Sequence, residues 1–94
     1  MKESYPVIIR KGQSHYIPYV PDFDISTQGE TITDAIEMAR DAIAVTGICY
    51  EEQGKEIPVP SPMDSIQPLK DEILTLVDVN FTAYREKEEQ AAAM

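Results

Sequence analysis

Residues 5–44 read YPVIIRKGQSHYIPYVPDFDISTQGETITDAIEMARDAIA and join short extended runs to one amphipathic helix. The first run, residues 5–11, is rich in β-branched side chains, which favour a pleated strand. Residues 12–14 contain glycine and serine and indicate a turn, after which residues 15–20 resume the extended pattern. Residues 25–29 add a third, shorter extended run. The stretch therefore predicts a hairpin, a third strand and then a helix.

Two residues in these runs carry backbone constraints. Pro18 has no N–H to donate to a sheet, so we expect the second strand to be irregular, with this residue at an edge or a bulge. Gly29 ends the third run, and we expect it to adopt the positive φ that lets the chain leave the strand.

The helix has a clear start. Thr31 followed by Asp34 is a capping-box pattern in its aspartate form. The helix is expected from about Ile32 to about Tyr50, because Gly47 weakens its end, and Gly54 and then Pro58 exclude its continuation. Its apolar stripe consists of Ile32, Ala35, Ile36, Ala39, Ile43 and Thr46.

The remainder of the chain adds one strand and a helical tail. Residues 55–68 hold most of the prolines and predict a loop without regular structure. Residues 72–80, EILTLVDVN, are apolar on both faces, which indicates an interior strand. The helix before them would return the chain to the sheet for a parallel pairing. Residues 82–94 predict a C-terminal helical tail, and all 94 residues make one small domain.

Composition limits the function. A net charge of −9 and a pI near 4.4 disfavour unaided nucleic-acid binding and favour a basic protein partner, although such charge also serves plain solubility. Cys49 is the only cysteine, which excludes an intrachain disulfide and fits a reducing cytoplasm. The chain has no apolar signal core and no run of membrane-spanning length. We expect a soluble, cytoplasmic protein.

Catalytic and metal-binding patterns are weak. His15 is the only histidine and has no nucleophile at a known motif spacing, so a structural role is expected. Asp22 and Asp24 are the nearest thing to a metal site, but carboxylates around a proline turn more often make the turn itself. No phosphate-binding glycine motif occurs. The sequence predicts a binding protein rather than an enzyme, without cofactor, metal or catalytic residues.

Several short segments, taken in order, resemble the HicB family of antitoxins. They are Tyr5-Pro6-Val7, Gly12, Tyr16 to Asp22, Thr27-Gln28-Gly29, Thr31 to Ala35, Gly54 to Ser61 and Val77 to Tyr84. The pattern departs from the family at Asp24–Ile25, where relatives usually carry proline and glycine. Many relatives continue into a C-terminal DNA-binding module, whereas this sequence stops at Met94, so we expect no specific duplex-DNA binding by the chain alone.

The resemblance implies an α+β fold, a small partial ribonuclease H-like β-β-β-α-β domain with a short C-terminal helix. It also implies an antitoxin that neutralises a small basic HicA-like, mRNA-cleaving toxin by covering its active surface. Two alternatives stay open, a stand-alone HicB-like interaction or regulatory module without a toxin, and a metal-dependent hydrolase. Exposed sheet edges further predict a homo-oligomer. The expected partner-binding residues are Tyr16, Tyr19, Asp22, Asp24 and Glu30.

Overall fold

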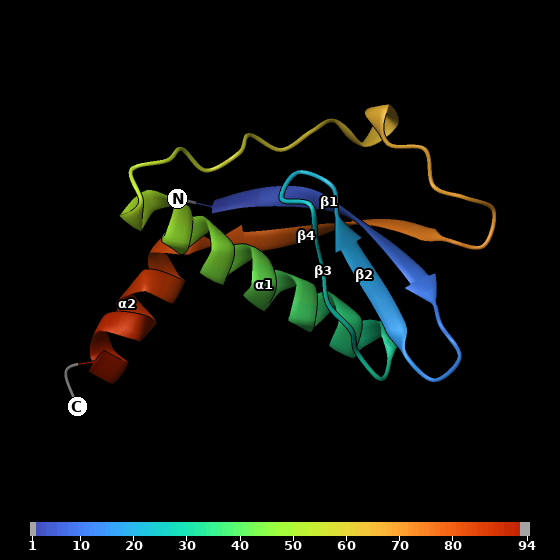
Figure 1. Cartoon of the computed structure of the whole chain (residues 1–94), viewed down its shortest axis with the longest axis horizontal. Helices are drawn as coiled ribbons and strands as arrows, with labels where there is room; N and C mark the ends of the chain where they lie inside the picture. The colour runs from blue at the N-terminus through green and yellow to red at the C-terminus, as the bar shows by residue number, and fades with distance from the viewer. Residues whose placement is uncertain (1, 93–94) are drawn as a thin grey trace.

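The computed structural model describes residues 2–92, with side chains up to residue 87. The elements are, in order, β1 (Lys2–Lys11), β2 (Tyr16–Val20), β3 (Ile25–Ser26), α1 (Ile32–Glu52), the short 3-10 helix Met63–Ser65, β4 (Ile73–Asn80) and α2 (Phe81–Ala92) (Figure 1). This is the α+β order β-β-β-α-β with a C-terminal helix that the family resemblance implied, and that prediction is confirmed. The last two residues of the expected tail, 93–94, lie outside the described residues.

The sheet is antiparallel throughout, in the order β3-β2-β1-β4. The predicted parallel pairing of the last strand is wrong, because residues 53–72 carry the chain back along the sheet before β4 begins (Figure 1). The prediction of an interior last strand is also wrong. β4 is an edge strand, and its apolar residues Ile73 and Leu76 are 43% and 51% exposed.

Pro18 lies in a regular strand, contrary to expectation. It is almost fully buried and stands opposite Ile9 of β1 in an unbroken register. Tyr16 exchanges backbone hydrogen bonds with Gly29, and the carbonyl of Pro18 accepts from Thr27. Because alternate residues point to the same neighbour, the missing N–H of Pro18 faces the short β3 side rather than β1. The ladder that joins β1 to β2 therefore loses nothing.

The start of α1 confirms the predicted cap. Thr31 accepts a hydrogen bond from the Asp34 amide at 3.0 Å, while the Asp34 carboxylate accepts from the Glu30 amide. The helix runs to Glu52, slightly beyond the predicted end. Gly29 does not have the expected positive φ. Glycine is required there because a Cβ would lie 2.4 Å from the backbone nitrogen of Ala35, in the first turn of the helix.

The hydrophobic core fills the space between α1 and one face of the sheet. Gly47 does not end α1, which continues to Glu52. It lets the ring of Phe81 approach the helix, since a Cβ at this position would lie 2.4 Å from the ring. α2 thus begins with a residue that locks it against α1. The core consists of Tyr5, Val7, Ile9, Val20, Phe23, Ala35, Ala39, Ile43, Ala44, Val77, Val79 and Phe81.

The proline-rich segment is ordered by two anchors. The hydroxyl of Tyr5 donates to the carbonyl of Pro58 at 2.7 Å, and burial raises the pKa of this phenol to about 12, which keeps it a donor. The carboxylate of Asp22 accepts from both the amide and the hydroxyl of Ser61. The predicted loop is therefore a fixed segment. Within residues 2–92, no helix is long and apolar enough to cross a membrane.

Candidate functional site

The sheet face that points away from α1 carries a shallow hollow. Side chains alternate along a strand, so the neighbours of the buried Tyr5, Val7 and Ile9 point to this second face, which we call the open face. The end of the proline-rich segment contributes to the hollow through Leu69 and Glu72. The hollow measures about 340 Å³ and is lined by Ile8, Arg10, Ile17, Tyr19, Ser26, Leu69 and Glu72.

The carboxylate of Glu72 fixes one side of the hollow and lies close to three nitrogen donors. The carboxylate of Glu72 accepts from the amide of Leu69 at 2.7 Å and from Arg10 Nε at 2.9 Å, and a second guanidinium nitrogen lies 2.8 Å away. The hydrogen bond from Leu69, and then the one from Arg10, lower the pKa of Glu72. Glu72 stays ionised and fixes the last turn of the segment against the sheet.

Tyr19 and Asp24 form a second polar contact close to this hollow. The Tyr19 hydroxyl donates to Asp24 Oδ1 at 2.8 Å, and this bond raises the pKa of the phenol. Asp24 has φ of 52°, a left-handed conformation that aspartate tolerates better than most residues. It lies where the sequence departs from the family pattern, and the chain turns there through a left-handed aspartate.

The five predicted partner-binding residues do not form a single cluster. Tyr16 lies on the α1 side of the sheet and packs against the core, whereas Tyr19 lies on the open face. The carboxylate of Asp22 is occupied by Ser61. Glu30 is exposed at the start of α1, and Tyr19 and Asp24 are the pair in direct contact. A role in partner binding stays a prediction for all five.

Sequence reasoning missed the apolar floor of the hollow. Strand alternation places Ile8 and Ile17 opposite the core residues of β1 and β2, so a regular second strand would have revealed them. Leu69 is 68% exposed and follows a proline in the loop. Nothing in its local sequence indicates that it lies against the sheet.

The only histidine and the only cysteine of the chain have local partners. His15 Nδ1 lies 2.8 Å from the hydroxyl of its neighbour Ser14, and both side chains are exposed in the first turn. Cys49 is exposed and its sulfur accepts a hydrogen bond from Gln53. In the part of the chain that the structure describes, no three His, Cys, Asp or Glu residues are grouped as metal ligands would be.

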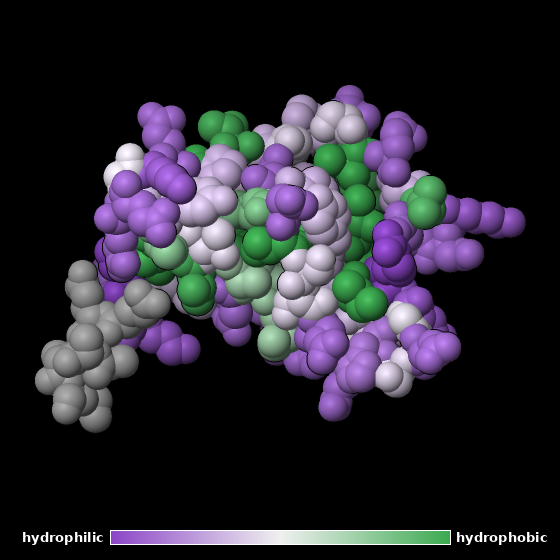
Figure 2. Space-filling view, in the orientation of Figure 1, coloured by the Kyte–Doolittle hydropathy of each residue, from purple (hydrophilic) through white to green (hydrophobic). Residues whose placement is uncertain are grey.

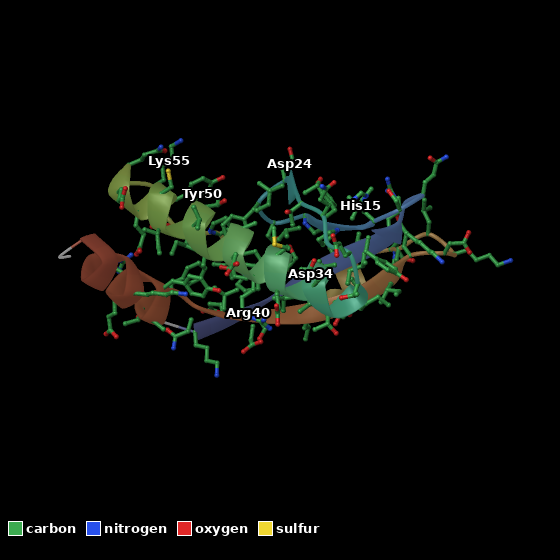
Figure 3. The ribbon with its side chains drawn as sticks, turned by 90° about the horizontal axis from the view of Figure 1, so that it is seen from below. His15, Asp24, Asp34, Arg40, Tyr50 and Lys55 are labelled. Carbon is green, nitrogen blue, oxygen red and sulfur yellow. The ribbon has the colours of Figure 1, made fainter. Side chains whose placement is uncertain are left out.

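The surface over α1 is mixed rather than evenly polar. Figure 2 shows hydrophilic side chains mostly toward both ends of this face, with pale and green residues between them. Met38 and Val45 of α1 are 38% and 54% exposed. Figure 3 places Arg40 on the side of α1 that faces β4, and its guanidinium binds Asp78 at 3.0 Å. Arg10, Arg40 and Arg85 each pair with a carboxylate, so much of the positive charge is already compensated.

Two sequence relatives resemble most of the described domain. The chain is 35% identical over 63 residues to the antitoxin HicB of Escherichia coli K12, a match covering 65% of this chain and 46% of that protein. It thus spans about half the length of that relative. It is also 33% identical over 90 residues to a 14.9 kDa protein from the rep-hol intergenic region of Haemophilus phage HP1, covering 92% of this chain and 68% of the phage protein.

Two solved structures share the fold. A chain of a toxin-antitoxin complex from Streptococcus pneumoniae superimposes with a TM-score of 0.78 at 25% identity, covering 89% of this chain and 73% of that one. A chain of the HicA3 and HicB3 toxin-antitoxin complex gives a TM-score of 0.67 at 26% identity, covering 82% of this chain and 98% of that one. The family model that describes the HicB-like antitoxins of bacterial toxin-antitoxin systems matches residues 5–93 of this sequence. The chain therefore belongs to the HicB-like antitoxin family.

Proposed function

We propose that this protein neutralises a small basic HicA-type toxin by covering the toxin's active surface, and that it does so in the cytoplasm without catalysis of its own. The observation that carries the proposal is the family match over residues 5–93. The likeness to a chain of the HicA3 and HicB3 complex supports the class of partner. The net charge of −9 supports its electrostatic character.

The charge distribution favours a fast encounter with a basic partner. The ion pairs of Arg10, Arg40 and Arg85 neutralise three of the eight basic side chains inside the molecule. The excess of carboxylates therefore dominates the field that an approaching protein meets. Complementary charge raises association rates more than it slows dissociation. For the same reason we propose no direct nucleic-acid binding by this domain alone.

The open face offers the apolar part of a contact. Ile17 is 37% exposed and lies beside Tyr19, and the hollow between them and Leu69 can receive one large side chain of a partner. Asp24 and Glu30 are exposed carboxylates that would contact basic residues around such an anchor. Asp22 and Tyr16 would act indirectly, by fixing the proline-rich segment and the second strand.

The first test is co-expression with a HicA-type toxin encoded beside the gene. The wild-type chain is expected to restore growth and to form a complex whose association slows as salt screens the charges. In the double variant Asp24→Asn, Glu30→Gln, association should slow by about tenfold or more, because rim charges steer the encounter, while dissociation changes little. Both rates are measured by surface plasmon resonance.

The matched control is the double variant Glu56→Gln, Asp64→Asn, which removes two exposed charges from the proline-rich segment. Its association should stay within about threefold of the wild type. Equal slowing in both variants would mean that only net charge matters. If co-expression of the wild-type chain fails to relieve the toxicity of the toxin, the proposed function itself is contradicted.

A further inference from the structure

The two edge strands of the sheet, β3 and β4, differ in length. β3 comprises two residues, followed by the isolated bridge between Tyr16 and Gly29, so this edge is short. β4 is eight residues long, contains no proline and carries one charged residue, Asp78. Long, apolar edges without proline are templates for pairing with another strand.

Backbone register identifies which groups of β4 point outward. Tyr16 bonds to Gly29, so Ile17 and Tyr19 bond to β1, and their partners Arg10 and Ile8 use their backbone groups toward β2. The remaining residues of β1, Tyr5, Val7 and Ile9, then bond to Val77, Thr75 and Ile73. The residues of β4 whose N–H and C=O face away from the sheet are therefore Leu74, Leu76 and Asp78.

Both ends of this outward row are closed. Arg40 of α1 reaches the edge and donates from Nε to the carbonyl of Asp78 at 2.8 Å, which agrees independently with the register (Figure 3). At the other end, the backbone amide of Glu72 donates a hydrogen bond to the carbonyl of Leu69. Within residues 2–92, no backbone bond to the outward groups of Leu74 or Leu76 is present.

We infer that this open stretch of β4 pairs with the same stretch of a second copy of the chain, antiparallel and about a two-fold axis at Thr75. A strand edge is self-complementary in this arrangement, and Leu74 of each copy would face Leu76 of the other. These two bonded pairs supply about four hydrogen bonds. The sheets of the two copies would then form one continuous sheet.

The local charges permit this contact despite the net charge of −9. Glu72 and Asp78 flank the stretch and would meet across the axis, but each already has an arginine partner, Arg10 and Arg40. Leu76 would lose its exposure next to Leu74 of the other copy. The inference concerns a different surface from the hollow and does not depend on the toxin.

Amide hydrogen exchange at two concentrations tests the contact directly on the wild-type chain. In dilute protein the amides of Leu74 and Leu76 should exchange freely, while those of Thr75 and Val77 are protected by β1. At about 100 µM, above the dissociation constant of a typical weak dimer, Leu74 and Leu76 should become protected by at least about tenfold. A monomeric mass by light scattering at this concentration would overturn the inference.

Variants locate the contact. Leu76→Lys places a charge on the edge and should weaken association by at least about tenfold. Leu69→Lys makes the same change at an exposed position off the edge and should leave the dimer intact. Arg40→Gln removes the arginine partner of Asp78, which would face Glu72 of the other copy, and should weaken association. A dimer that survives Leu76→Lys, with the fold verified by circular dichroism, would place the interface elsewhere.

Discussion

The two faces of this sheet are built from alternate residues of the same strands but differ in how deeply their side chains are buried. On the α1 face, Val7, Ile9 and Val77 are almost fully buried. On the open face, Ile17 and Leu76 are also apolar but remain partly exposed. Hydropathy alone therefore does not distinguish core from surface in this molecule. What distinguishes them is which face the helix covers.

The largest effect that separates the faces is expected from matched isoleucine truncations. Ile9→Ala, in the core, should lower the free energy of unfolding by about 2–5 kcal/mol, because it removes buried methyl groups and leaves a cavity. Ile17→Ala, on the open face, should cost less than about 1 kcal/mol. Urea denaturation of both variants measures the difference. Equal losses would mean that the open face is buried in solution, by a second copy or by the proline-rich segment.

A middle-sized effect is expected where the covered face is packed most tightly. Gly47→Ala gains about 1 kcal/mol of helix propensity but drives a Cβ into the Phe81 ring, and overpacking costs about 1–3 kcal/mol. The net result should be a loss of about 1 kcal/mol by thermal or urea unfolding. Val45→Ala, at an exposed position of the same helix, should be nearly neutral or slightly stabilising.

A double-variant cycle sharpens this prediction. Phe81→Leu shortens the facing side chain, so Gly47→Ala should become less costly in the Phe81→Leu background than in the wild type. If Gly47→Ala alone stabilises the protein, the close approach of α2 to α1 is not a constraint on the fold.

Some features of the fold could be predicted from the sequence and others could not. The cap of α1 could be predicted because Thr31 and Asp34 interact within one turn. The direction of β4 could not, because it depends on the path of residues 53–72, and proline content says nothing about where a loop goes. The requirements for Gly29 and Gly47 arise from Ala35 and Phe81, contacts that no local pattern contains.

The candidate site was predicted only in part, for a similar reason. Tyr16 and Tyr19 were predicted to lie together near the strand ends and turns, although a regular strand puts residues three apart on opposite faces. The strand is regular because the missing N–H of Pro18 faces β3. The contact between Tyr19 and Asp24 brings together two predicted residues, but the hollow beside it required the fold.

The smallest expected effect concerns the open face and depends on pH. The amide of Leu69 and the guanidinium of Arg10 hold the pKa of Glu72 below its ordinary value of 4.5. A carboxylate with a lowered pKa in the folded state stabilises the protein fully above its unfolded pKa, and this contribution disappears as the pH falls through the folded pKa. Glu72→Gln should therefore be less stable than the wild type at pH 7, and the gap in stability should narrow below about pH 4.

The control variant Glu56→Gln removes the same charge from an exposed position of the proline-rich segment and should show a smaller difference from the wild type at both pH values. Thermal unfolding from pH 3 to pH 7 measures all three proteins. A gap between wild type and Glu72→Gln that is constant over this range would show that the carboxylate does not secure the segment against the sheet, and the open face would then owe its shape to apolar contacts of Leu69 alone.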